Sequence, residues 1–401
     1  MNRRRAQLDV AIVGGGVVGT TVALLLADVG LDVALVEAAS PARWDAGRPD
    51  LRVYAFAPDN VALLDRLGVW QDIAAARVQP YRHMRVWDAA GGGDLRFDAD
   101  AMGRQELGWI VEHGLLVDRL GAALADAGVR VACPARVDAL EPHDDVVRLR
   151  LEDGATLDAR IAIAADGPDS TLRTLAGLAV SCHDYAQRGV VAYVETARPH
   201  EETAWQRFLP GGPLALLPCK ADAGDPAAGR VSSIVWTVPE ADATRLLALD
   251  DAAFNDALTR AFDARLGDVI LRSPRVAFPL RRQLVEAQAA GRVLVLGDAA
   301  HVVHPLAGQG VNLGLRDAAA LAGSIAGARA AQRDWASPHR LARWARLRKS
   351  ENAIAAYSFD AINRVFSNER PGTTLLRGRL LEAAGHLPPL TRALWRRAAG
   401  L

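Results

Sequence analysis

The sequence predicts an α/β protein in which a Rossmann-like domain is interrupted by an inserted antiparallel β-sheet and followed by a C-terminal helical segment. Three observations support this fold class. A short buried strand at residues 8–13 leads through a glycine-rich turn into a helix and a second strand. Short strands follow one another after about residue 180, at the spacing of an antiparallel sheet. Residues 293–296 then return to the buried-strand pattern.

The first third of the chain alternates strands and helices. Residues 8–13 and 33–37 are short, apolar and β-branched, which predicts parallel strands on either side of a helix at 17–27. The same reasoning predicts a helix at 111–127, strands at 86–87, 95–97, 129–131 and 161–164, and a hairpin at 137–157 that turns at Asp153-Gly154.

The middle and the end of the chain differ in pattern. Strands are predicted at 189–194, 205–209, 214–217 and 231–238, with a turn at 210–213 and an amphipathic helix at 251–266. Long helices follow from Gly310 onward. We therefore divide the chain into a dinucleotide-binding domain at 1–180 with a short β excursion near 80–100, a β-rich substrate domain at 181–285, a return to the first domain at 286–335, and a C-terminal helical region at 336–401.

Composition excludes several classes of protein. Half of the 401 residues are apolar and 23% are charged, so the chain is not disordered. Lys plus Arg equals Asp plus Glu, at 47 each, which argues against a nucleic-acid partner. The three cysteines form no disulfide framework, and we expect neither a spanning helix nor a signal peptide, so the expected location is cytoplasmic.

The first motif is Gly14-x-Gly16-x-x-Gly19, which follows a predicted strand and opens a helix. Gly14 permits the tight turn, Gly16 lets a pyrophosphate approach the helix N-terminus, and Gly19 allows close packing of helix and strand. Glu37 ends the second strand, where a carboxylate accepts hydrogen bonds from a ribose. The motif predicts one permanently bound dinucleotide; the alternative is a glycine-rich turn without function. No second such motif is present, so a nicotinamide cofactor would bind without a Rossmann unit of its own.

The second motif is Gly297-Asp298 at the end of a buried strand, followed by a glycine-rich run at 304–314. Asp298 is placed to bond a polyol or ribityl chain, and Gly308 and Gly310 let backbone lie flush against a flat ring. A helix beginning near Gly310 would point its positive end at that ring. The alternative is a strand followed by a capped helix. His301 and His304 lack a third ligand nearby, so no metal site is predicted.

The third motif is Asp166-Gly167, again at the end of a predicted strand and close to Arg173. On its own it is equally compatible with an ordinary capped turn.

Together, in this order, the three motifs resemble those of the flavoprotein aromatic hydroxylases of the p-hydroxybenzoate hydroxylase type. In that family the first motif binds the ADP part of FAD, the Asp166-Gly167 motif serves FAD and the visiting NAD(P)H, and the Gly297-Asp298 motif binds the ribityl region. The run from residue 304 to Asp317 resembles, more narrowly, the signature of the ubiquinone-biosynthesis hydroxylases. The resemblance extends over nearly the whole chain.

The resemblance implies a FAD-dependent monooxygenase that hydroxylates the aromatic ring of a polyprenylated phenol or quinol through a flavin C4a-hydroperoxide. Segments at 80–82, 203–208, 212–213 and 393–395 favour 2-polyprenyl-3-methyl-6-methoxy-1,4-benzoquinol as the substrate. The alternatives are a sister hydroxylase acting on a 2-polyprenylphenol or 6-methoxyphenol, another flavin enzyme of this fold such as a polyene reductase or a catabolic phenolic-acid hydroxylase, and a non-catalytic, FAD-stabilised member of a quinone-biosynthesis assembly.

The resemblance also assigns residues. We expect Arg52, Pro305 and Gly308 at the catalytic centre, with Arg52 beside the isoalloxazine or the nicotinamide; the alternative for Arg52 is a surface arginine. The remaining predicted cofactor-binding residues are His113, where the subfamily usually has Asn, and Gly310, Val311 and Asn312 at the start of the helix.

The implied cofactors are FAD, NAD(P)H as reductant, and O2. The insoluble prenyl tail of the substrate calls for contact with a membrane surface, at the inner membrane, or with a ubiquinone-biosynthesis protein complex. Residues 370–401 carry six Arg and one Glu among leucines, as in helices that lie on anionic membranes, although a helical cap on the core has the same pattern. A homo-oligomer, the tail length and the choice of NADH, NADPH or a protein electron donor are left open.

Overall fold

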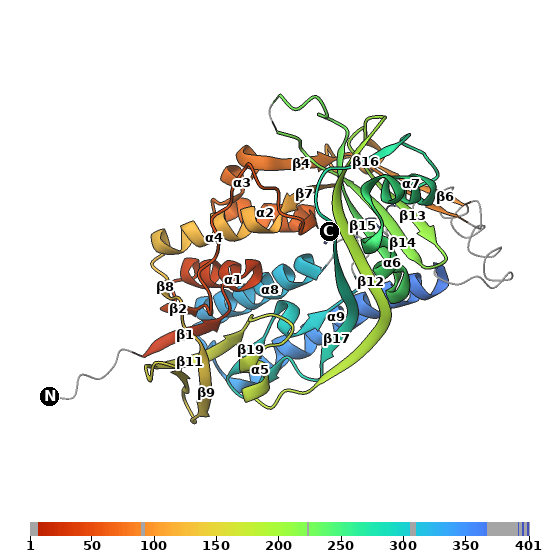
Figure 1. Ribbon diagram of the computed structural model, residues 1–401. Coiled ribbons are helices and arrows are strands. Elements are labelled where there is room, and N and C mark those ends of the chain that lie inside the picture. The colour runs from red at the N-terminus through yellow and green to blue at the C-terminus, as the bar shows by residue number, and fades with distance from the viewer. Residues whose placement is uncertain are drawn as a thin grey trace.

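The computed structural model describes residues 7–89, 93–222, 224–304 and 310–366, together with five positions between 392 and 400. Figure 1 shows a part with a parallel sheet, built mainly from residues 8–164 together with residues 289–295, beside a large sheet built mostly from residues 180–302. The long helix at residues 338–366 lies along both parts.

The first part is an eight-stranded sheet with a parallel centre. Its order is β18-β19-β11-β1-β2-β8, and β9 and β10 extend β11 as an antiparallel meander. The strands are β1 Leu8–Val13, β2 Val33–Val36, β8 Arg130–Ala132, β9 Val137–Pro142, β10 Val147–Leu151, β11 Thr156–Ala164, β18 Ala289–Ala290 and β19 Val293–Val295. The central strands are buried on both faces, which is why they are continuous apolar runs in the sequence.

Helices cover both faces of this sheet. The helices α1 (Val17–Asp28), α4 (His113–Asp126) and α8 (Gly310–Ala330) pack together on one face. The short helix α5 (Thr171–Leu175) contacts β9 and β11 on the other. The long helix α9 (Pro338–Phe366) contacts α8 and strands of both large sheets, so it joins the two parts (Figure 1).

The second part is a nine-stranded sheet, antiparallel except where β13 pairs with β5. Its strands are β5 His83–Asp88, β6 Asp94–Asp98, β12 Val180–Thr196, β13 Thr203–Leu209, β14 Gly212–Pro218, β15 Val231–Pro239, β16 Val269–Leu271, β17 Val276–Val285 and β20 His301–Val302. Alternate side chains face opposite sides. In β15, Ile234 and Trp236 pack towards α6 (Glu240–Ala248) and α7 (Asp251–Ala261), whereas Val235 and Thr237 face a cavity.

A small third sheet and two helices complete the described chain. The sheet consists of β3 (Val53–Phe56), β7 (Gly108–Glu112) and β4 (Val78–Tyr81). The helices α2 (Pro58–Arg66) and α3 (Trp70–Arg77) lie between β3 and β4 in the sequence.

The predicted fold class is confirmed, and two predicted helices differ in their ends. The helix predicted at 111–127 begins only at His113, because residues 111 and 112 finish β7. The helix predicted at 251–266 ends at Ala261, because Asp263 and Ala264 have positive φ angles that a helix cannot contain. The division into four parts stays a prediction. Most of the predicted C-terminal region beyond Phe366 lies outside the described residues.

Candidate active site

The three sequence motifs meet at one edge of the parallel sheet. Gly14 follows β1, Asp166 follows β11 and Gly297 follows β19, and these three strands are neighbours. Backbone hydrogen bonds hold the edge together, from Gly14 N to the Val36 carbonyl (2.8 Å) and from Ala165 N to the Val13 carbonyl (2.8 Å). The carboxyl edge of a parallel sheet is where nucleotides bind in folds of this type.

In the glycine turn after β1, Gly14 and Gly19 pack against neighbouring backbone, whereas Gly16 faces open space. Gly14 has φ +106°, and a side chain there would overlap the carbonyl of Ala165. Gly19 packs against the carbonyl of Gly14. Gly16, in contrast, has nothing within 4 Å of the position that a Cβ would take, and it begins α1 with no side-chain cap and no acidic residue in the first turn. An open, uncapped helix N-terminus fits a diphosphate, so these residues fit the FAD that the fold implies.

Glu37 lies beside this turn at the end of β2. Its carboxylate accepts hydrogen bonds from Gly15 N (2.5 Å) and from Ala39 N (2.9 Å). The side chain is therefore fixed next to the glycine turn, at the position where the sequence predicts a ribose contact.

The Asp166-Gly167 turn has the hydrogen bonds of a capped helix start. The Asp166 carboxylate accepts from the Ser170 hydroxyl and from Leu172 N (3.1 Å). Arg173 donates to the carbonyls of Pro168 (2.8 Å) and Ala299 (2.9 Å), which joins this turn to the Gly297-Asp298 turn. The capped turn that the sequence left as an alternative is present, and a cofactor contact of Asp166 and Gly167 stays a prediction.

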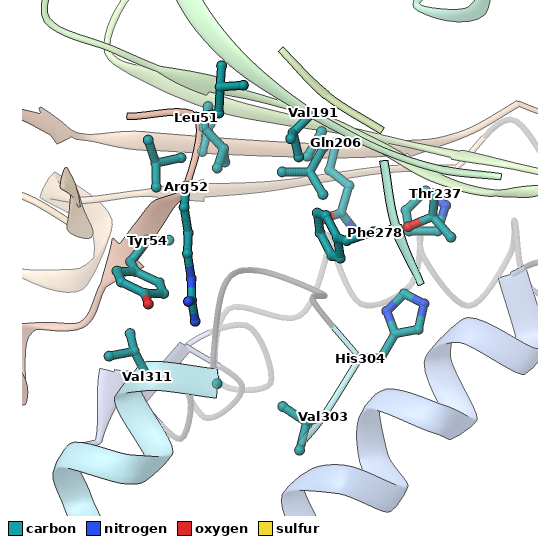
Figure 2. A pocket seen from close by; sticks show the side chains of 18 of the residues that line it. Leu51, Arg52, Tyr54, Val191, Gln206, Thr237, Phe278, Val303, His304 and Val311 are labelled. Carbon is teal, nitrogen blue, oxygen red and sulfur yellow. The ribbon is translucent and has the colours of Figure 1, made fainter. Parts of the chain in front are cut away.

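A cavity of about 570 Å³ lies between this edge and the nine-stranded sheet. Its wall is mostly apolar, and Figure 2 shows side chains from both parts pointing into it. Residues that line it from the sheet include Val191, Gln206, Ala215, Leu217, Val235, Thr237 and Phe278; other segments contribute Arg52, Tyr54, Asp298, Val303, His304, Gly310 and Val311. A largely apolar concave site with a few polar groups is typical of a small-molecule site.

Arg52 and Asp298 form a polar corner of the cavity. Arg52 Nη2 lies 3.7 Å from Asp298 Oδ2, and both side chains are partly exposed, at 57% and 38%. The Arg52 guanidinium also lies over the Tyr54 ring, 5.3 Å from its centroid. Tyr54 Oη is 3.0 Å from His113 Nδ1. Burial, and next the charge of Arg52, lower the pKa of His113 to about 4, so this imidazole is neutral near pH 7.

Gly310, Val311 and Asn312 begin α8, and the first two line the cavity. The Asn312 side chain is buried and accepts hydrogen bonds from Ala57 N (2.9 Å) and Asn60 Nδ2 (2.9 Å). It therefore ties α8 to the segment after β3. Two predicted catalytic residues, Pro305 and Gly308, lie outside the described residues.

The sequence did not reveal the buried hydrogen-bond network that holds the turn carrying Asp298. The buried Asp317 of α8 accepts hydrogen bonds from Gly297 N (3.3 Å), from Arg348 Nε (2.7 Å) and from Asn352 Nδ2 (3.0 Å), and its Oδ2 lies 2.6 Å from His301 Nε2. Burial opposes ionisation of Asp317, but His301 and then Arg348 overcome it and hold its pKa below the usual value. The one signal in the sequence was that Asp317 ends the run from residue 304.

The fold and the glycine turn, together with the family match and the relatives given next, identify the class: a FAD-dependent monooxygenase with the fold of the p-hydroxybenzoate hydroxylase type. Residues 7–354 match the FAD binding domain family, and the chain belongs to this family. It is 37% identical over 396 residues to the 3-demethoxyubiquinol 3-hydroxylase of Escherichia coli, covering 98% of both chains. It is 36% identical to the ubiquinone hydroxylase UbiL of Rhodospirillum rubrum, covering 98% of this chain and 89% of that protein.

Among solved structures, the p-nitrophenol 4-monooxygenase of Pseudomonas putida superposes with a TM-score of 0.77 at 20% identity, covering 98% of each chain. The anhydrotetracycline hydroxylase of Streptomyces rimosus gives a TM-score of 0.71 at 21% identity, covering 98% of this chain and 76% of that one. At these identities the likeness concerns the fold. Within the described part of the chain, none of the helices has the length and apolar character needed to cross a bilayer.

Proposed function

We propose that this chain hydroxylates the aromatic ring of a prenylated phenol or quinol in ubiquinone biosynthesis, and that its substrate is 2-polyprenyl-3-methyl-6-methoxy-1,4-benzoquinol. The observation that carries this proposal is the large apolar cavity directly beside the Arg52–Asp298 corner. The similarity to a demethoxyubiquinol hydroxylase over 98% of the chain supports the choice of substrate.

Bound FAD supplies the redox and oxygen chemistry, with NAD(P)H as the reductant and O2 as the oxygen source. The residues of the chain have to bind, orient and exclude water. Gly16 leaves room for the diphosphate at the α1 N-terminus, and Arg52 brings positive charge to the cavity edge, where it stabilises charge on a reduced flavin or attracts the nicotinamide. The apolar wall keeps water away from the reacting ring, which limits the loss of oxidising equivalents as hydrogen peroxide.

The insoluble tail of such a substrate requires a lipid surface. We propose a cytoplasmic enzyme that touches the membrane, and side chains on α9 support this contact. Ile354 is 51% exposed and Tyr357 is 56% exposed, on a helix that also carries Arg340, Arg343 and Lys349. An amphipathic helix with basic residues favours an anionic bilayer. Sedimentation with anionic vesicles tests this, with neutral vesicles as the control.

The experiment that tests the proposed function is NAD(P)H oxidation by the purified holoprotein, with and without a short-tailed methoxyphenol or quinol. Faster oxidation with the aromatic compound, together with a hydroxylated product, is expected, and the product identifies the ring position. A different ring position would favour a sister hydroxylase. Bound FAD without any response to phenols would instead favour a protein electron donor or the non-catalytic assembly member.

A further inference from the structure

His304 is a buried histidine at the wall of the cavity. It lies two residues after the end of β20, lines the cavity and is 1% exposed. Neither ring nitrogen has a hydrogen-bond partner among the residues that the structure describes. Figure 2 shows the imidazole on the side of the cavity where Thr237 and Phe278 lie, across from Arg52 and Tyr54.

Among the described residues, the contacts behind His304 do not engage its ring nitrogens. The Tyr185 ring packs edge-on against the imidazole, with centroids 5.2 Å apart. The Tyr185 hydroxyl donates to Asp360 of α9, and Asp360 also pairs with Arg282 of β17. The Tyr185 hydroxyl and the Asp360 carboxylate are thus hydrogen-bonded to each other, and His304 meets only the tyrosine ring.

His304 is a hydrogen-bond acceptor in this environment. Burial lowers its pKa to about 4, against the opposing effect of the Asp360 charge, so the ring is neutral near pH 7. A neutral imidazole has one acceptor nitrogen and one N–H donor. Leaving such a group buried without a partner is unfavourable, and a ligand hydroxyl in the cavity would remove that penalty.

Other groups in the cavity suit the rest of such a ligand. Gln206 of β13 lines the same cavity, and Val191, Val235 and Phe278 give it apolar surface for a ring and the start of a tail. Arg52 lies on the opposite side in Figure 2, and its partner Asp298 follows the strand edge where the flavin is expected. A phenol held with its hydroxyl at His304 would therefore lie between this side chain and the cofactor.

We propose that His304 is a substrate-recognition residue, whose imidazole accepts the hydrogen bond of a ring hydroxyl of the phenolic substrate. This assignment rests on the proposed function. It makes His304 responsible for distinguishing a phenol or quinol from the same ring with its hydroxyl methylated, because the methyl ether has no proton to donate.

The test measures binding to the FAD-loaded protein by the change in flavin absorbance, without NAD(P)H. The two probes are a short-tailed methoxyphenol and its methyl ether. The wild type is expected to prefer the phenol by about tenfold, as for one hydrogen bond to a buried group. His304→Leu is expected to abolish the preference, whereas His304→Gln keeps part of it, because its amide oxygen still accepts.

His200→Leu is the matched control. His200 is also buried, at 3% exposed, and its Nε2 also lacks a partner among the described residues, but it does not line the cavity. This variant should keep the phenol preference. A preference unchanged in His304→Leu would overturn the assignment while the proposed function stands. A wild type that binds neither probe and hydroxylates neither would overturn both.

If the His304→Leu protein fails to retain FAD, its binding preference cannot be measured, and a second measurement on the wild type tests the same hydrogen bond. In wild-type protein labelled with nitrogen-15 at histidine, the His304 imidazole signal, identified by its absence in His304→Gln, should shift with the phenol. It should not shift with the methyl ether. Equal shifts with both probes, or none with either, would contradict the hydrogen bond.

Discussion

At the scale of single residues, the glycines of the first motif have separable roles. A side chain at Gly14 would overlap the carbonyl of Ala165, whereas a side chain at Gly16 would enter open space at the start of α1. One glycine is thus required by the fold, and the other leaves the space that the predicted cofactor would occupy.

Gly16→Ala should therefore fold normally and lose its cofactor. We expect its free energy of unfolding without FAD to change by less than about 1 kcal/mol, because the new methyl group meets nothing. Its affinity for FAD should fall at least about tenfold, because the methyl group occupies the diphosphate position. Urea unfolding and fluorescence titration with FAD measure the two effects. Gly14→Ala is the contrast and should lose about 2–5 kcal/mol of stability. A Gly16→Ala protein with unchanged FAD affinity would place the diphosphate elsewhere.

Replacing Arg52 should also affect activity without affecting stability. Its ion pair with Asp298 is long and exposed, and such pairs contribute less than about 1 kcal/mol. Arg52→Ala should keep its melting temperature within a few degrees but lose at least about tenfold in kcat/KM for NAD(P)H oxidation. Arg281→Ala, which breaks another exposed pair with Asp169, is the control and should keep both. Full activity in Arg52→Ala would support the surface-arginine alternative.

At the scale of elements, the turn that carries Asp298 depends on two helices. Asp317 of α8 receives hydrogen bonds from Gly297 N and from Arg348 and Asn352 of α9. These groups come from segments distant in the sequence, and together they fix the start of the turn from below.

Asp317→Asn should destabilise the protein by about 3–5 kcal/mol, because it removes one charge of a buried network. The pKa of Asp317 is lower in the folded protein than in the unfolded chain. Its stabilisation is therefore present above the unfolded pKa, about 4, and is lost as the pH falls through the lower folded value. Urea unfolding at several pH values should show this loss in the wild type and not in Asp317→Asn. Asp334→Asn, which removes a surface ion pair with Arg160, is the control. A loss of stability in Asp334→Asn as large as that in Asp317→Asn would contradict this explanation.

Local patterns predicted the elements that bring the motifs together, and missed those that depend on distant contacts. The strands β1 and β11 end in apolar runs, at residues 10–13 and 161–164, and the Gly14 and Asp166-Gly167 motifs come right after them, so their joint edge could be predicted. The network around Asp317 could not be, because Arg348 and Asn352 are ordinary polar residues in the sequence and meet Asp317 only when α9 packs on α8. The sequence marks His304 as the start of the glycine-rich run and as a residue without enough partners for a metal site, but its place on the cavity wall could not be predicted, because it depends on the second sheet.

At the scale of the whole molecule, the cavity exists because two differently built parts face each other. The parallel-sheet part contributes the predicted cofactor edge, and the nine-stranded sheet contributes the apolar wall. Filling the cavity from the sheet side should therefore affect the substrate and spare FAD.

Ala215→Phe tests this arrangement. Ala215 lies on β14 and faces the cavity, so a phenyl ring there would occupy space meant for the substrate. We expect the FAD content to stay the same and the KM for a short-tailed quinol to rise at least about tenfold. Steady-state kinetics and the visible spectrum measure both. If the variant lost FAD and its KM for the quinol stayed unchanged, the assignment of the cofactor to the parallel-sheet part and of the substrate to the nine-stranded sheet would be wrong.

The most direct test of the central claim is the origin of the oxygen atom in the product. The FAD-loaded protein is incubated with NAD(P)H, a short-tailed 6-methoxybenzoquinol and oxygen gas labelled with oxygen-18, and the product mass is measured. A flavin-dependent hydroxylase incorporates one labelled atom into the ring. NAD(P)H oxidation that yields only hydrogen peroxide and unchanged quinol, or a protein that cannot be loaded with FAD, would contradict the account.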